Sequence, residues 1–232
     1  MKSETFRNYA TAVVIISLIA GIITACTKMD DYKKYLKDGP IIYTGRVDSL
    51  TVYPGKNRVL LTMLLLSDPK ITKVKVYWNN RHDSSVQNIV RSSGVDTVKF
   101  MLTNLAEGTY SFEVYTYDNS GHSSVLVTAD GQVYGQGYIN TLFNRPIKSV
   151  TYRNRDTTLV KWFGASAQTL GEEMKYTDSL GVLRNVYTPM QDTMSLLYRI
   201  KRNAFFQYRT LYKPDIKAID TFYSQYQSVQ VL

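Results

Sequence analysis

Short runs of alternating apolar and polar residues, each ended by a turn, fill the chain from Tyr43 to Thr128. Alternation puts every second side chain on one face, so each run is expected to be a strand with one face buried. Turn residues such as Pro54-Gly55 separate the runs. The runs are 46–53, 57–66, 71–79, 86–91, 97–102, 109–118 and 123–128. Strands at this spacing predict an antiparallel sandwich.

The same pattern begins again at Ile147, with runs at 149–152, 158–163, 172–177, 182–187, 193–197, 204–212 and 219–231. Between the two sets, Gly131 to Pro146 lacks strand alternation and is expected to connect two domains. The predicted fold class is all-β, with two tandem antiparallel β-sandwiches. The first is expected at 41–146, including the link, and the second at 147–232.

The N-terminus has the order of a secretory signal. Lys2 and Arg7 precede an uncharged, mostly apolar stretch from Ala10 to Ala25, and Cys26 follows. The residues Ile23-Thr24-Ala25-Cys26 look like a lipobox, which predicts cleavage of a signal peptide, residues 1–25, and acylation of Cys26. The alternative is an uncleaved membrane anchor, but a span needs about 20 apolar residues, and this stretch is shorter.

Cys26 is the only cysteine in the chain, so disulfides within the protein are excluded. Two or three acyl chains hold a protein stably on a membrane. The mature protein is therefore expected on a membrane through its lipid, with residues 26–40 as a tether. Asp30-Asp31 resembles the acidic export signal of Bacteroidota lipoproteins on the outer membrane surface. A solvated acidic linker explains this pair equally well, so the leaflet stays open.

The formal net charge of +9 favours anionic partners such as lipopolysaccharide phosphates, acidic glycans or acidic proteins. Nucleic acid is not expected, because a secreted protein does not meet it and the sequence has no nucleic-acid-binding motif.

Two stretches resemble parts of a fibronectin type III domain. Residues 104–124, with Gly108 to Val114 as their strand, resemble its last hairpin. Thr158 to Trp162 resembles its second strand, in which a tryptophan lies in the core. Trp78 and Trp162 each share strand parity with valines and are expected in the two cores.

The chain also resembles one lipoprotein family. The lipobox, Gly108 to Val114, Val133 to Gly135, Phe206 to Thr210 with Pro214, and Ile219 to Tyr223 look like the Bacteroidota lipoproteins catalogued as domain of unknown function 4998. The resemblance implies a setting on the outer membrane beside glycan-uptake systems. It provides no catalytic residues and no cofactor.

The sequence gives no sign of catalysis. His82 and His122 lie in loops without further ligands, so no metal site is predicted. Glu172 and Glu173 are adjacent on an expected strand, where they point to opposite faces and cannot form a glycosidase pair. Phosphate and dinucleotide motifs are absent. The protein is expected to be no enzyme and to need no cofactor.

Six residues are possible ligand-binding candidates: Tyr134, Tyr138, Phe143, Arg199, Lys201 and Arg202. The three aromatic residues lie in the link, where they could stack on a sugar or pack the link itself. The three basic residues begin a stretch without acids that continues through Arg209 and Lys213. It could bind an acidic glycan or envelope partner, or be a solvated strand face.

These observations leave three classes of function, because a sandwich fold hosts all of them. The first is a non-catalytic surface module that binds or presents glycan or protein partners beside an outer-membrane uptake system. The second is a structural or adhesive spacer without a ligand, and the third is a glycan-active enzyme.

Cys26→Ala should abolish acylation, because no other thiol can accept the lipid. Metabolic labelling with a fatty acid measures this, and the variant should also leave the membrane fraction. Label retained by the variant would contradict the lipoprotein hypothesis.

Overall fold

The computed structural model describes residues 42–66, 68–153 and 157–232. The predicted signal peptide, Cys26 and the tether lie outside the described residues. The strands described here all belong to one compact unit, Tyr43–Leu232. No helix within the described ranges has the length and apolar character needed to cross a membrane.

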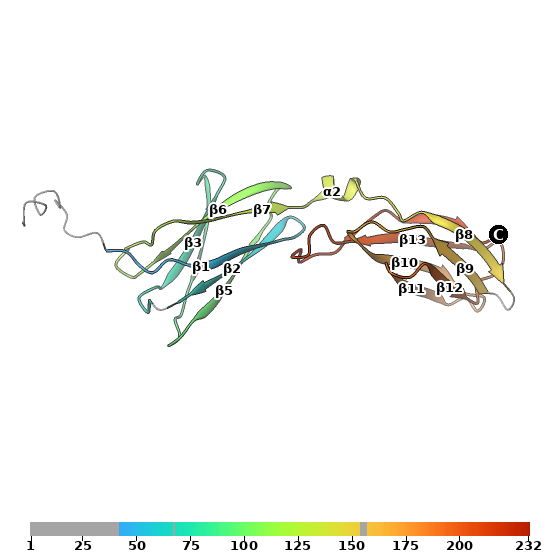
Figure 1. Cartoon of the computed structure of the whole chain (residues 1–232), viewed down its shortest axis with the longest axis horizontal. Helices are drawn as coiled ribbons and strands as arrows, with labels where there is room; N and C mark the ends of the chain where they lie inside the picture. Colours follow the sequence, from blue (N-terminus) through green and yellow to red (C-terminus); the bar gives the residue numbers. More distant parts are fainter. Residues whose placement is uncertain (1–41, 67, 154–156) are drawn as a thin grey trace, which may run out of the picture. The chain divides into compact units, whose positions relative to one another are not determined.

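The first half of this unit forms two antiparallel sheets (Figure 1). One sheet has the order β1-β2-β5, from β1 (Asp48–Pro54), β2 (Arg58–Leu65) and β5 (Asp96–Thr103). The other has the order β4-β3-β6-β7, from β3 (Lys73–Trp78), β4 (Asp83–Asn88), β6 (Gly108–Tyr117) and β7 (Val127–Val133).

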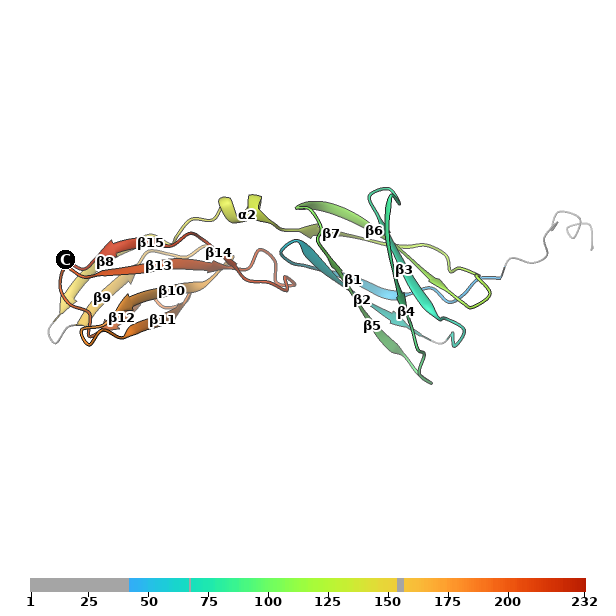
Figure 2. The ribbon, with the colours of Figure 1, turned by 180° about the vertical axis from the view of Figure 1, so that it is seen from behind.

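The second half repeats this strand order, as Figure 2 shows from behind. One sheet has the order β12-β9-β8, from β8 (Ile147–Arg153), β9 (Thr157–Trp162) and β12 (Met194–Tyr198). The other has the order β11-β10-β13-β14, from β10 (Thr169–Thr177), β11 (Leu183–Pro189), β13 (Phe205–Tyr212) and β14 (Phe222–Tyr223). β15 (Gln227–Gln230) also pairs with β13. A short helix, α2 (Gln136–Asn140), precedes β8.

Alternation along the strands builds a core in each half. On β2 every second side chain is buried, and these side chains pack with Val74, Val76, Phe112 and Val114 of the facing sheet. A separate cluster in the second half joins side chains of β9, β10 and β13, among them Met174. The predicted fold class, all-β with two antiparallel sandwiches, is confirmed. The domain boundary at residues 146 and 147 stays a prediction.

The predicted strands 123–128 and 219–231 were wrong, and the same kind of hydrogen bond explains both errors. The backbone N–H of Thr116 donates to the Ser124 hydroxyl at 3.1 Å. A side chain there takes the place of a backbone carbonyl between strands, and β7 begins only at Val127. In the second sandwich, the N–H of Thr210 donates to the Ser224 hydroxyl at 2.8 Å. The expected strand 219–231 is therefore split into β14 and β15.

The link is also shorter than expected, because Gly131 lies inside β7. A Cβ atom at this position would lie 2.3 Å from Cγ1 of Val52. Gly131 therefore lets β7 pass close to β1, and its role is close packing between sheets rather than a turn.

The two tryptophans differ in burial. Trp162 is buried in the second core, and its Nε1–H donates to the Ser195 hydroxyl at 2.7 Å. Trp78 is only partly buried and packs against the edge of the first cluster. The core prediction is thus confirmed for Trp162 and only partly for Trp78.

Trp162→Ala should lower the free energy of unfolding by about 3–5 kcal/mol, because it removes a fully enclosed ring. Trp78→Ala should cost clearly less, since solvent already reaches its ring. Urea denaturation of the mature chain with Cys26→Ser, which carries no lipid, measures both. Equal losses in the two variants would contradict this ranking.

Candidate functional site

Asp220, in the loop between β13 and β14, ties the second sandwich to the first. Its carboxylate accepts hydrogen bonds from Arg58 Nε at 3.0 Å and from the N–H of Lys56 at 2.8 Å. The N–H of Ile219 donates to the Pro54 carbonyl at 2.8 Å. The hydrogen bond from Arg58 holds the pKa of Asp220 below its usual value, although burial acts in the opposite direction. These bonds join that loop to the turn between β1 and β2.

Gly55 allows the loop to approach this turn. A Cβ atom at Gly55 would lie 2.6 Å from Oδ2 of Asp220 and 2.8 Å from Cγ1 of Ile219. Any side chain there would push the loop away, so the Pro54-Gly55 pair is both a turn signal and a contact surface.

Tyr134 and Tyr138 of the link pack at this joint. The Tyr134 carbonyl accepts from the N–H of Asn57 at 2.8 Å. The two tyrosine rings lie 4.8 Å apart, and each meets the ring of Phe222, at 5.7 and 5.1 Å between centroids. Glu107 accepts hydrogen bonds from two N–H groups at the start of α2, including that of Tyr138. Both tyrosines thus serve the packing of the joint, and burial raises their pKa values.

Phe143 lies apart from these rings and is 80% exposed. Its carbonyl accepts a hydrogen bond from the Tyr212 hydroxyl at 2.5 Å. The three aromatic candidates of the link therefore do not form one platform.

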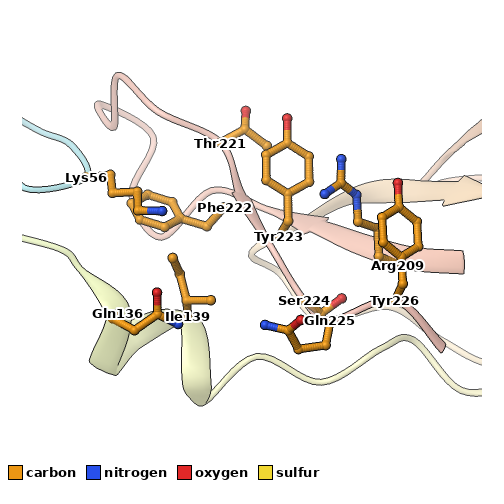
Figure 3. A pocket seen from close by; sticks show the side chains of 10 residues that line it. All are labelled: Lys56, Gln136, Ile139, Arg209, Thr221, Phe222, Tyr223, Ser224, Gln225 and Tyr226. Atoms are coloured by element: carbon orange, nitrogen blue, oxygen red, sulfur yellow. The ribbon is translucent and has the colours of Figure 1, made fainter.

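A hollow of about 380 Å³ opens beside the joint (Figure 3). Its lining comes from the β1–β2 turn, from α2, from β13 and from the segment that carries β14. The residues are Lys56, Gln136, Ile139, Arg209, Thr221, Phe222, Tyr223, Ser224, Gln225 and Tyr226. Aromatic rings and hydrogen-bonding groups thus share its wall, as in a ligand site.

Arg209 is the central charged group of this wall. Its Nε donates to Oε2 of Glu173 at 2.6 Å, and its guanidinium lies 3.9 Å from the ring centroid of Tyr223 and 4.6 Å from that of Tyr226. Burial works against ionisation of Glu173, but the hydrogen bond and charge of Arg209 hold its pKa below the usual value. Both charges are therefore fixed in a pair.

Glu172 points to the opposite side of β10, as predicted from the alternation. It is fully buried, and its Oε2 accepts a hydrogen bond from Nη1 of Arg145 at 3.1 Å. Burial raises the pKa of Glu172 to about 6, although the charge of Arg145 acts in the other direction. Glu172 and Glu173 thus lie on two faces of the sheet and cannot act on one substrate together.

The basic stretch is divided by the fold. Arg199, Lys201 and Arg202 are exposed in the turn between β12 and β13, and the described residues give none of them an ion-pair partner. Arg209 lies on β13 in its pair with Glu173. The three candidates therefore form one basic turn that excludes Arg209.

The two histidines have different surroundings. His82 is exposed in a turn. His122 lies with Nδ1 2.7 Å from Oδ2 of Asp118, and this contact holds the pKa of Asp118 below its usual value. Across the described ranges, no three His, Cys, Asp or Glu side chains are placed to hold a metal ion.

Sequence reasoning missed the hollow and the aromatic residues Tyr187, Tyr223 and Tyr226. Tyr223 and Tyr226 fell within a run expected to be one continuous strand, where alternation would put them on opposite faces. The split into β14 and β15 instead brings both rings to the Arg209 guanidinium. Strand alternation does place Arg209 on the face opposite the buried Tyr208. This was the one feature of the sequence that indicated that Arg209 lies on the outer face.

The first sandwich has a three-stranded and a four-stranded sheet, and the second has a three-stranded and a five-stranded sheet. This arrangement gives the chain a fibronectin type III-like fold. A family model described as a domain of unknown function, DUF4998, matches residues 26–222, and the chain belongs to this family.

Solved structures similar to this chain include a two-domain fibronectin type III segment of chicken tenascin. The identity is 14% and the TM-score 0.32, with 80% of this chain and 98% of that chain covered. The FN1–FN3 domains of chicken CNTN1 match at 12% identity and a TM-score of 0.43, with 81% of this chain and 66% of that chain covered. No curated protein sequence matches the chain.

Glu172 should make the stability of the fold depend on pH. Its pKa is about 6 in the folded protein against 4.5 in a free side chain, so between these values only the folded state keeps the proton. The free energy of unfolding should therefore fall by about 2 kcal/mol as the pH rises from 4.5 to above 6. Urea denaturation at a series of pH values measures this.

Glu172→Gln should remove this dependence. Glu173→Gln is the matched control, because the pKa of Glu173 is lowered and its contribution is lost only as the pH falls below the ordinary range of a carboxyl. An unchanged pH profile in Glu172→Gln would contradict the prediction.

Proposed function

We propose that this protein is a lipid-anchored, non-catalytic module that binds or presents a glycan or protein partner at the outer membrane surface, beside an uptake system. The observation that carries this proposal is the hollow at the joint. Its wall offers rings and hydrogen-bonding groups, while its one arginine is already paired with a carboxylate, Glu173. Such a wall can hold a ligand by contact.

The state of the two carboxyls near the hollow supports binding rather than hydrolysis. General acid catalysis uses a carboxyl with a raised pKa that reaches the substrate. Glu172 has the raised pKa but is fully buried against Arg145, while Glu173 reaches the surface with a lowered pKa. The properties that a glycosidase combines at one site are therefore on opposite faces of β10.

The proposed location rests on the N-terminal sequence. The family match begins at residue 26, which is the first residue of the expected mature chain. Cys26 would carry the lipid, and residues 26–40 would separate the first sandwich from the membrane. Asp30-Asp31 fits an export signal and a solvated linker equally well, so the proposal leaves the leaflet open.

A spacer without a ligand is the second candidate, and the joint favours it. Asp220 binds Arg58 and Lys56 of the first sandwich, and Phe222 packs against Tyr134 and Tyr138. A joint fixed by both polar and aromatic contacts suits a protein whose task is to hold a distance.

The proposal is tested with the mature chain carrying Cys26→Ser. It should bind a component of an array of glycans and envelope proteins and should release no reducing sugar from any polysaccharide. If an acidic ligand binds at the basic turn, Arg199→Ala, Lys201→Ala and Arg202→Ala together should weaken it, and salt should do the same. Release of reducing sugar would contradict the non-catalytic assignment. A failure to bind any component would contradict the binding function and favour the spacer function.

A further inference from the structure

On the outer face of β10 and β11, the hydroxyl end of a tyrosine side chain lies against the backbone of the neighbouring strand. The Tyr187 hydroxyl donates to the Leu170 carbonyl at 2.9 Å. A Cβ atom at Gly171 would lie 2.8 Å from Cζ of Tyr187, so the ring lies across a position where no side chain fits. Tyr187 is nevertheless 54% exposed. The hydroxyl end of the ring is therefore held at the backbone, while more than half of the residue's surface is open to solvent before a ligand arrives.

Strand register places polar groups in line with this ring. Tyr187 of β11 is opposite Glu173 of β10, and Glu173 is opposite Arg209 of β13. The guanidinium of Arg209 in turn stacks on the ring of Tyr223. Across the sheet, the row consists of a ring, a carboxylate, a guanidinium and a second ring, and we name these four residues the tyrosine row.

The tyrosine row contributes Arg209 and Tyr223 to one hollow and all four of its residues to a second. One is the hollow at the joint, and the other has a volume of about 320 Å³. The second is lined by Glu173, Asn185, Val186, Tyr187, Arg209, Leu211 and Tyr223. Because the two hollows share Arg209 and Tyr223, a ligand made of several linked units could extend from one into the other.

We infer that the tyrosine row binds a neutral saccharide chain, an inference that rests on the proposed binding function. A pyranose ring has an apolar face that stacks on an aromatic ring, and its neighbouring hydroxyls match planar groups with two donors or two acceptors. Tyr187 supplies the ring, while Glu173, Arg209 and Asn185 supply such planar groups.

The charges of the face favour an uncharged ligand. Glu173 accepts a hydrogen bond from Arg209 and lies 3.7 Å from Nζ of Lys175, so both cations already have a carboxylate partner. A strongly acidic ligand would have to compete with this carboxylate. The basic turn at Arg199, by contrast, has no acid among its described partners.

On the first sandwich, a comparable pair of tyrosine rings is covered by neighbouring side chains. Its outer face carries Tyr77 and Tyr115, whose rings meet edge to face with centroids 6.0 Å apart. Arg81 pairs with Glu113 and lies 5.9 and 5.6 Å from the two ring centroids. These rings are covered by each other and by a cation, so Tyr115 is a matched control for Tyr187.

Affinity electrophoresis of the mature chain with Cys26→Ser tests the inference, in gels that contain a β-glucan, a xylan, a mannan or an α-glucan. At least one of these neutral polysaccharides should retard the protein. Tyr187→Ala should weaken that binding about tenfold, since a stacked ring is lost. Tyr115→Ala should bind like the parent chain, and about 1 M NaCl should leave the affinity nearly unchanged.

Melting temperatures check that the variants fold. If Tyr187→Ala does not fold, Tyr223→Ala decides, because Tyr223 borders both hollows and should show a comparable loss. The inference is wrong if a polysaccharide retards Tyr187→Ala and Tyr223→Ala as strongly as it retards the parent chain.

The remaining outcomes separate this inference from the proposed function. If none of the polysaccharides retards the parent chain, the inference is wrong, whereas binding to an envelope protein would still support the proposed function. If binding is lost only in the triple alanine variant at the basic turn, the ligand is acidic and binds there, which also overturns the tyrosine row. A chain that binds neither glycans nor envelope proteins contradicts both proposals.

Discussion

The buried ion pair between Arg145 and Glu172 is the constraint on which the second sandwich depends. Arg145 also donates from Nε to the Phe163 carbonyl at 2.7 Å and from its N–H to the Thr210 hydroxyl at 2.7 Å. One residue thus joins the link to the end of β9, to β10 and to β13. Truncating either side chain would leave buried polar groups of the other without a hydrogen-bond partner, which destabilises a fold. Because Glu172 is held inward, Glu173 must face outward, where it meets Arg209.

The same threonine–serine hydrogen bond occurs in both sandwiches, but the loops that precede the serine differ. A threonine late in β6 or β13 bonds the serine hydroxyl of the following segment, as Thr116 does with Ser124 and Thr210 with Ser224. In the first sandwich the intervening loop is a tight turn around Asp118. In the second it is longer and carries Asp220 to the β1–β2 turn. The joint, and the hollow beside it, follow from this difference in loop length.

Much of the fold could be predicted because alternation reports burial directly. The runs around β2 and β10 were found in this way, and the opposite faces of Glu172 and Glu173 followed from the same parity. The predictions failed where a side chain replaced a backbone bond, as at Ser124 and Ser224. A hydroxyl that accepts from a neighbouring strand leaves no periodic signal, because its effect depends on a residue distant in the sequence.

The sequence alone determined the all-β class, the repetition of the sandwich and the tryptophan of the second core, because strand parity and turn residues are local properties. Which distant side chains meet was decided only by tertiary structure. The Tyr187 hydroxyl reaches the neighbouring strand because Gly171 there has no side chain. Arg209 is separated from the other basic residues because β13 pairs with the strand that carries Glu173. The register between paired strands decides which side chains become neighbours across a sheet. This register depends on the packing of both sheets.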